Sequence, residues 1–357
     1  MNSLFTPIRL RDLEIRNRVW MPPMCQYHAT DGLPEDWHFV HYGARAAGGY
    51  GLIIAEATGI VPEGRISPAC TGLWNDEQAA AWSRIVSFVH SQGAKMGIQL
   101  NHAGRKASTI PWLPGRGDGS VREGGWETVG PSAVAQEGID PPREMTLEEI
   151  QALPGQFAAA ASRAVRADFD TVELHGAHGY LLHQFLTPLA NHRTDEWGGS
   201  FENRTRLFRA VARAVRGVLP EGMPLLVRLS ATDWIDGAWD LEQSVALASL
   251  LIDDGVDLID VSTGGAANAR IPVGPGFQVE FASEIRRRSG MPTAAVGMIT
   301  EPEQALAIVE SGDADAVLIG RAGLRDPSWA LRAAHETGLD RSEIPYPDSY
   351  WRASWRR

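Results

Sequence analysis

Two imidazoles and a phenol lie within six residues of one another near the middle of the chain, at His175, His178 and Tyr180. They follow residues 171–174, a short apolar run typical of a buried strand, and two intervening glycines allow the backbone to turn sharply. Two imidazoles can donate hydrogen bonds to one oxygen, and a phenol beside them can deliver a proton. The segment is therefore predicted to polarise a carbonyl group and then to protonate the substrate.

The same histidines leave two other interpretations open. The loop could be purely structural, with imidazoles that cap nearby carbonyls, or His175, His178 and His183 could supply three nitrogen ligands to a metal. His38 and His41 also lie close together, in a segment with a helical pattern. Zinc proteases carry a glutamate directly after the first histidine of a helical pair, and none follows His175. A metal-dependent barrel hydrolase is thus the alternative function, and we expect no metal.

The composition is that of an ordinary globular protein, with 44% hydrophobic and 22% charged residues. A net charge of -11 argues against a nucleic-acid partner. No apolar run is long enough to cross a membrane, and the first residues lack the pattern of a signal peptide. The two cysteines, Cys25 and Cys70, form neither a disulfide framework nor an iron–sulfur motif. We therefore expect a cytoplasmic protein without membrane or nucleic-acid partners.

Short apolar runs alternate with helical segments from one end of the chain to the other. Continuous apolar runs of this length are typical of parallel strands that are buried on both faces. Eight such units predict an α/β protein with a (β/α)8 TIM barrel, and the whole chain 1–357 as one domain. A doubly wound open sheet is the second choice, but its glycine fingerprint is absent from the sequence. The expected strands are 18–21, 52–55, 95–100, 171–174, 224–229, 258–261, 293–296 and 316–319.

Some segments exceed what a plain barrel needs. Residues 6–16 are predicted to form a hairpin that plugs the bottom of the barrel. Residues 101–145, rich in glycine and proline, are too long for a simple connection and are predicted to be a lid. A capping box at 146–149 starts a helix, which Pro154 is expected to split into two pieces. The aromatic and basic tail, 345–357, is predicted to lie at an oligomer interface.

In a barrel, the active site forms at the carboxyl ends of the strands. Glycines after the last two strands leave backbone N–H groups free for a phosphate, and an arginine adds charge there. A small side chain, an amide and a guanidinium at other strand ends suit a flat ring that carries negative charge when reduced. Together these features predict flavin mononucleotide, FMN. The residues concerned are Gly297, Gly320 and Arg321 for the phosphate and Ala57, Gln99 and Arg228 for the ring.

These residues, in this order, resemble the old yellow enzyme family of flavin-dependent ene-reductases. The resemblance covers essentially the whole chain and is closest to the short bacterial branch, which includes the xenobiotic reductases and thermophilic-type enzymes. A cysteine at position 25 with a tyrosine at position 27 marks that branch. The motifs that carry the resemblance lie at 17–18, 22–27, 56–58, 99–106, 173–180, 193–204 and 320–321.

The resemblance implies one non-covalent FMN and either NADPH or NADH as hydride donor. It implies that His175 and His178 bind the oxygen of the substrate and that Tyr180 donates the proton. Cys25 would lie against the flavin and tune its potential, and Tyr27 would touch the substrate. The residues expected to contact FMN are Pro22, Pro23, Met24, Cys25, Ala57, Gln99, Arg228, Gly297, Gly320 and Arg321.

The activity implied by the resemblance is a ping-pong reduction of activated C=C bonds. Its substrates would be small-molecule enones and related activated alkenes, and nitro compounds as well. The family also implies a homodimer or homotetramer in which the tail of one subunit reaches the active site of its neighbour. Trp351 and Arg352 are the two residues expected to border the neighbour's substrate pocket.

Overall fold

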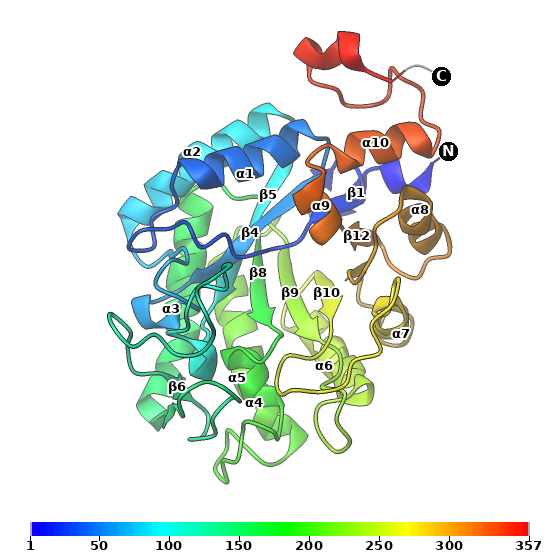
Figure 1. Ribbon diagram of the computed structural model, residues 1–357. Coiled ribbons are helices and arrows are strands. Elements are labelled where there is room, and N and C mark those ends of the chain that lie inside the picture. Colours follow the sequence, from blue (N-terminus) through cyan, green and yellow to red (C-terminus); the bar gives the residue numbers. More distant parts are fainter. Residues whose placement is uncertain (1, 356–357) are drawn as a thin grey trace.

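A computed structural model describes residues 2–355 and contains a closed barrel of parallel strands (Figure 1). The barrel closes where the last strand pairs with the first, at Val317 with Val19 and Leu318 with Trp20. Each of the eight apolar runs forms one strand of the barrel, so the predicted (β/α)8 fold is confirmed. Around the barrel the strands are β3 (Val19–Met21), β4 (Leu52–Gly59), β5 (Lys95–Asn101), β8 (Thr171–Gly176), β9 (Leu225–Ser230), β10 (Leu258–Ser262), β11 (Thr293–Ala295) and β12 (Ala316–Leu318).

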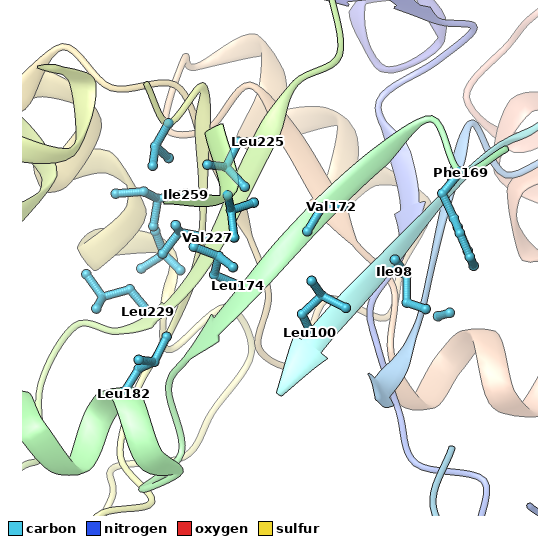
Figure 2. Packing of buried hydrophobic residues seen from close by; sticks show 14 of the residues in the cluster. Ile98, Leu100, Phe169, Val172, Leu174, Leu182, Leu225, Val227, Leu229 and Ile259 are labelled. Atoms are coloured by element: carbon cyan, nitrogen blue, oxygen red, sulfur yellow. The ribbon is translucent and has the colours of Figure 1, made fainter. Parts of the chain in front are cut away.

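Helices form the outer layer and bury one apolar face each against the strands (Figure 1). Figure 2 shows part of this core, where Leu174, Val227 and Leu229 lie beside Leu182 of a helix. The helices are α1 (Asp36–Ala47), α2 (Asp76–Ser91), α3 (Leu147–Arg166), α4 (Leu181–Leu186), α5 (Phe201–Arg216), α6 (Leu241–Asp253), α7 (Val279–Ser289), α8 (Pro302–Glu310), α9 (Arg321–Arg325) and α10 (Trp329–Glu336), with 3-10 helices η1 (Ser3–Phe5), η2 (Pro62–Gly64), η3 (Gly104–Lys106) and η4 (Asp348–Ala353).

Helix α3 corrects one expectation. Its capping box is present, since Thr146 N–H donates to Glu149 Oε2 at 2.8 Å and Glu149 N–H donates to Thr146 Oγ1 at 3.2 Å. The helix then continues through Pro154 instead of splitting there. Proline removes one helical hydrogen bond, but Leu153 and Phe157 on either side of it are buried in the core. We infer that this packing outweighs the lost bond.

The amino-terminal end of the barrel is closed by the predicted hairpin of β1 (Ile8–Leu10) and β2 (Leu13–Ile15), which pair antiparallel. Its apolar side chains pack in one cluster with residues at the beginnings of the strands. This cluster fills the bottom of the barrel and is separate from the core between strands and helices. Its members include Ile8, Leu10, Ile15, Trp20, Leu52, Leu226, Leu258, Ala294 and Ala316.

The long excursion after β5 contains only η3 and the two short strands β6 (Val129–Gly130) and β7 (Arg143–Glu144). It is nevertheless attached to the body: Arg105 Nη2 donates to Ala266 O at 2.5 Å and Trp126 Nε1 donates to Glu63 O at 2.8 Å. That it acts as a lid stays a prediction. None of the helices in residues 2–355 combines the length and hydropathy that spanning a bilayer requires.

Candidate active site

A cavity of about 310 Å³ lies at the carboxyl ends of the barrel strands. Gly297 has φ +119°, and a Cβ there would lie 2.8 Å from Gln278 Nε2, so the position is suited only to glycine. Arg321 is exposed, and among residues 2–355 no carboxylate lies within ion-pair distance of its guanidinium. Most of the residues predicted to contact the cofactor line this one cavity: Pro22, Pro23, Met24, Arg228, Gly297, Gly320 and Arg321.

A buried polar network underlies the same cavity. Arg228 Nε lies 3.1 Å from Asp260 Oδ2, and Gln99 Nε2 donates to Glu173 Oε1 at 2.8 Å. Burial, together with the nearby Asp260 charge, raises the pKa of Glu173 to about 8. Burial likewise raises the pKa of Asp260 to about 6. At neutral pH, therefore, Glu173 is mostly protonated, and the Arg228 cation is balanced by the Asp260 carboxylate.

These groups fit a flat ring with a phosphate tail. The unpaired Arg321 guanidinium and the glycine-lined wall suit a phosphate. Gln99 Oε1 accepts no hydrogen bond from residues 2–355, so it can receive a ring N–H while its amide nitrogen stays fixed by Glu173. The donor set therefore fits FMN.

The end of β8 brings three reactive side chains together. The ring centroids of His175 and His178 are 5.3 Å apart, and those of His175 and Tyr180 are 4.8 Å apart. His175 Nδ1 is buried and has no hydrogen-bond partner among residues 2–355. His178 Nε2 lies 2.8 Å from Ser262 Oγ. An oxygen-bearing ligand in contact with both rings would satisfy the unpaired nitrogen.

The environment keeps all three groups neutral. Burial and the charge of Arg228 lower the pKa of His175 and of His178 well below the usual range, so both imidazoles are uncharged at pH 7. Burial raises the pKa of Tyr180, which therefore retains its proton. The loop can thus donate hydrogen bonds and one proton without carrying a net charge.

Lys106 is a site residue to which the sequence analysis gave no role. Its Nζ donates to His178 O at 2.8 Å and to Gly265 O at 3.2 Å, and it lies 5.1 Å from the centre of the Tyr180 ring. Burial lowers the pKa of Lys106 to about 8. Its sequence signals were its place in the turn after β5 and in the motif 99–106, and neither indicates a partner more than 70 residues away.

The remaining predicted residues lie beside this loop. Cys25, Tyr27 and Tyr180 pack against one small apolar cluster that contains Ala57 and Cys70. Interaction with the Cys70 thiol and burial raise the pKa of Cys25, so Cys25 is a protonated thiol and not a ready nucleophile. The expected cofactor and substrate residues therefore adjoin one another.

The geometry does not favour the metal site. His183 Nε2 lies 3.1 Å from Asp233 Oδ1, and its Nδ1 accepts the Gly179 N–H at 2.9 Å. His38 lies in α1 as expected, and its Nε2 lies 3.2 Å from Glu56 Oε1. Within the described part of the chain, no group of three or more His, Cys, Asp or Glu side chains is arranged to hold a metal ion. Both ring nitrogens of His183 thus already have partners within the chain, which does not favour the alternative in which His183 completes a set of metal ligands.

The tail lies away from this cavity. Residues 346–355 extend beyond α10, on the side away from the carboxyl ends of β8 and β9 (Figure 1). Trp351 is 45% exposed and lies under Arg341, whose Cζ is 4.2 Å from the ring centre. Trp351 and Arg352 are thus not part of the cavity of their own chain. Arg356 and Arg357, which belong to the predicted tail, lie outside the described residues.

The fold and the cavity define a barrel enzyme with a phosphate-bearing cofactor, and comparisons identify the family. Residues 3–340 match the NADH:flavin oxidoreductase / NADH oxidase family. The NADPH dehydrogenase of Listeria monocytogenes serovar 1/2a is 46% identical over 100% of both chains. That of Bacillus subtilis strain 168 is 44% identical over 98% of both chains.

Solved structures agree with this match. Morphinone reductase has a TM-score of 0.79 at 30% identity and covers 98% of this chain and 96% of its own. The old yellow enzyme homologue from Zymomonas mobilis has a TM-score of 0.78 at 29% identity over 99% of this chain and 100% of its own. The chain belongs to the NADH:flavin oxidoreductase / NADH oxidase family, the old yellow enzyme family. It is an FMN-dependent oxidoreductase that uses NADPH or NADH, and the hydrolase alternative is not favoured.

We expect Arg321→Ala to weaken the binding of FMN by about 10- to 100-fold, because a charged hydrogen bond contributes about 1.5–3 kcal/mol. FMN affinity should be measured by titrating the apoprotein and following flavin fluorescence. Arg206→Ala, on the exposed face of α5, is the control and should bind FMN like the wild type. Unchanged affinity in Arg321→Ala would show that the phosphate binds elsewhere.

Proposed function

We propose that the protein reduces the C=C bond of α,β-unsaturated carbonyl compounds by a ping-pong reaction with NADPH or NADH. The observation that carries this proposal is the group of two neutral imidazoles and one protonated phenol at the end of β8. Such a group stabilises a developing oxyanion and supplies a proton without itself being charged.

The cofactor would lie over the carboxyl ends of the strands. The backbone of residues 22–25, with Ala57, Gln99 and Arg228, would hold the ring, and Gly297, Gly320 and Arg321 would hold the phosphate. When bound, FMN accepts hydride from NAD(P)H and makes it available to the alkene. Because the Arg228 cation is held by Asp260, it can stabilise negative charge on the ring without moving.

The chain's own groups act on the substrate. His175 and His178 would donate hydrogen bonds to the carbonyl oxygen and draw electron density away from the β-carbon. Tyr180 would hold its proton until the α-carbon becomes basic and would then protonate it. Tyr27, which packs in the same cluster as Tyr180, would contact the substrate from the side of Cys25. Nitro oxygens accept the same hydrogen bonds, so nitro compounds belong to the proposed substrate range.

The test is to reduce the purified enzyme anaerobically with NADPH and, separately, with NADH, and then to mix it with candidate acceptors. Enones, maleimides and nitro compounds should restore the flavin absorbance in a second, saturable step, and the product from an enone should be the saturated ketone. An enzyme that is reduced by either nucleotide but is reoxidised only by oxygen would overturn the proposal.

We expect Cys25→Ala to shift the flavin potential and the balance of the two half-reactions while turnover continues. The thiol is protonated and packs against the apolar cluster that contains Cys70, so it is suited to tune the flavin and not to attack a substrate. Potentiometric titration and stopped-flow absorbance measure the two effects. Complete inactivation with FMN still bound would instead indicate covalent catalysis.

We also propose a homodimer or homotetramer in which Trp351 or Arg352 borders the substrate pocket of a neighbouring subunit. Several aromatic residues of the tail are exposed in the single chain, among them Tyr350, Trp351 and Trp355, and such a surface favours a protein contact. Truncation after Pro347 is expected to weaken the oligomer and to raise the KM for the enone together. Light scattering and steady-state kinetics measure these effects. A truncated protein with an unchanged mass and an unchanged KM would contradict the shared site.

A further inference from the structure

The loop between β8 and α4 has an unusual backbone conformation. His178 has φ +58° and Gly179 has φ +72°, so two successive residues occupy the left-handed region. This conformation costs a residue with a side chain about 1 kcal/mol or more, and it persists only where the surroundings fix it. The contacts of this loop therefore decide where the side chains of His178 and Tyr180 lie.

Each polar backbone group of His178 and Gly179 has a side-chain hydrogen-bond partner. His178 N–H donates to Ser230 Oγ at 3.0 Å, and His178 O accepts from Lys106 Nζ at 2.8 Å. Gly179 O accepts from Gln184 Nε2 at 2.7 Å. Gly179 N–H, which lies between the two functional side chains, donates to His183 Nδ1 at 2.9 Å.

The last of these bonds depends on the tautomer of His183. An imidazole nitrogen can accept a hydrogen bond only when it carries no proton, so the proton of neutral His183 must be on Nε2. That nitrogen lies 3.1 Å from Asp233 Oδ1, within ion-pair distance, and both side chains are 0% exposed. A carboxylate only accepts hydrogen bonds, so it selects the tautomer in which Nδ1 is free to accept.

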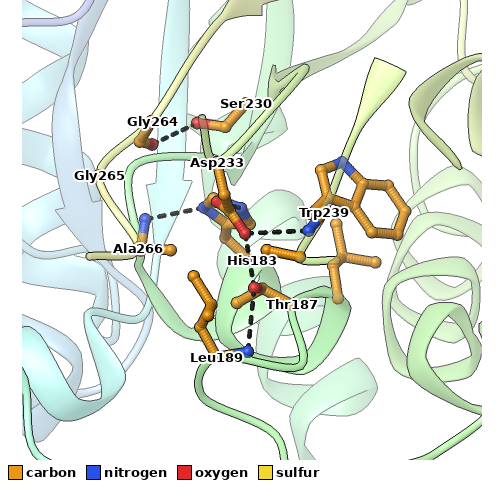
Figure 3. A network of polar contacts seen from close by, with 12 residues as sticks. His183, Thr187, Leu189, Ser230, Asp233, Trp239, Gly264, Gly265 and Ala266 are labelled. Atoms are coloured by element: carbon orange, nitrogen blue, oxygen red, sulfur yellow. Dashed lines mark hydrogen bonds and ion pairs between the residues drawn. The ribbon is translucent and has the colours of Figure 1, made fainter. Parts of the chain in front are cut away.

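Asp233 is itself fixed and ionised. Its Oδ2 accepts Thr187 Oγ1–H at 2.6 Å and Trp239 N–H at 3.2 Å, as Figure 3 shows. Burial alone would raise the pKa of Asp233, but interaction with His183 and these hydrogen bonds lower it below its ordinary value. The carboxylate therefore cannot turn away from His183 without losing both bonds.

We propose that His183 and Asp233 form a buried positioning pair for the substrate loop. Asp233 holds His183 as the Nε2–H tautomer, and His183 Nδ1 then holds the Gly179 peptide, which orients His178 and Tyr180. Neither residue touches the substrate, so both are positioning residues and not catalytic ones. This inference rests on the proposed function for the ligand that His178 and Tyr180 bind.

The decisive variant is Asp233→Asn, which keeps the shape and removes the charge. If the amide oxygen keeps the bonds from Thr187 and Trp239, the amide NH2 must face His183 Nε2. His183 Nε2 must then accept a hydrogen bond from this NH2 group, so the ring proton moves to Nδ1. Nδ1–H and the Gly179 N–H are then two donors that point at each other. The control is Thr187→Val, which removes one hydrogen bond from the same carboxylate but leaves the tautomer unchanged.

Two measurements on the FMN-loaded enzyme follow the effect. Histidine-selective ¹⁵N NMR should show Nε2–H in His183 of the wild type and of Thr187→Val, and Nδ1–H in Asp233→Asn. The Kd for 2-cyclohexenone, from the change in flavin absorbance, should rise at least about 10-fold in Asp233→Asn, because the buried Gly179 N–H is left without an acceptor. It should rise no more than about 3-fold in Thr187→Val, because Trp239 N–H still holds the same carboxylate oxygen and the bond from Gly179 to His183 is unchanged.

Changes at His183 provide a second route, which is useful if Asp233→Asn does not fold. In His183→Asn the side-chain oxygen can take the place of Nδ1 and accept the Gly179 N–H, whereas His183→Leu has no acceptor. Both leave Asp233 without its partner, so their difference isolates the bond to Gly179. We expect near wild-type enone affinity in His183→Asn and a loss of at least about 10-fold in His183→Leu. Asp233→Asn should have little further effect on affinity in the His183→Asn background.

The outcomes separate this inference from the proposed function. A wild-type tautomer with wild-type enone affinity in Asp233→Asn would overturn the positioning pair. Equal losses of enone affinity in Asp233→Asn and Thr187→Val would also overturn it. So would equal losses of enone affinity in His183→Asn and His183→Leu. If His178→Ala binds the enone normally, the proposed function fails, and the NMR result alone still shows whether Asp233 sets the tautomer of His183.

Discussion

Replacing His175 or His178 with alanine is expected to slow reoxidation of the reduced enzyme by 2-cyclohexenone by about 100-fold each, because one preorganised oxyanion donor contributes about 3 kcal/mol. The effect should be this large because both imidazoles are already neutral and close together before the substrate binds. FMN should stay bound, since its predicted contacts lie on other strand ends. Stopped-flow absorbance after anaerobic reduction gives the rate.

Two variants complete this experiment. His192→Ala changes an exposed histidine outside the cluster and should react like the wild type. Tyr180→Phe should slow the reaction only for substrates that need a proton from the enzyme. If the double variant His175→Ala, His178→Ala is reoxidised by 2-cyclohexenone at the wild-type rate, the two imidazoles do not bind the carbonyl oxygen.

Glu173→Gln is expected to raise the free energy of unfolding relative to the wild type, and the gain should grow with pH. The pKa of Glu173 is about 8 in the folded protein, above its value of about 4.3 in an unfolded chain. Between these values the folded state holds a proton that the unfolded state has lost, so wild-type stability falls as pH rises. For one such group the free energy of unfolding falls by about 1.4 kcal/mol per pH unit, which amounts to about 3–4 kcal/mol between pH 5 and 7.5.

Urea unfolding of the FMN-loaded proteins at several pH values measures this difference. Glutamine keeps the acceptor for Gln99 Nε2 but cannot ionise. The contribution of residue 173 to the pH dependence of the unfolding free energy therefore disappears. Glu196→Gln, at an exposed carboxylate, is the matched control. Its free energy of unfolding should depend on pH in the same way as that of the wild type. A constant difference between Glu173→Gln and the wild type from pH 5 to 7.5 would mean that Glu173 ionises at the ordinary pH.

The fold could be predicted because its signals are local. Each strand is a short apolar run, and eight such runs separated by helical segments allow few architectures other than a closed parallel barrel. The hairpin at 8–15 has the same kind of local signal. Pro154 misled the prediction because proline affects the local backbone, whereas α3 is stabilised by packing of Leu153 and Phe157 that is decided elsewhere in the structure.

The site was predictable only in part, for a related reason. His175, His178 and Tyr180 lie within six residues, at the end of β8 and on the loop after it, so their proximity is visible in the sequence. The contacts that fix the loop come from distant residues: Asp233 is 50 positions after His183, and Lys106 lies 72 positions before His178. Without those partners, His183 is simply a third histidine near two others, and that suggested a metal ligand.

The separate apolar cluster in the bottom of the barrel has a consequence for how this protein tolerates change. The hairpin and the beginnings of the strands form one packed unit, while the reactive side chains lie at the opposite ends of the strands and on the turns that follow them. Mutations that accumulate in those turns leave the packed unit intact. Substrate range can therefore diverge by drift or by directed evolution at little risk to folding, and the largely exposed segment 111–125 is the natural place to diversify a library.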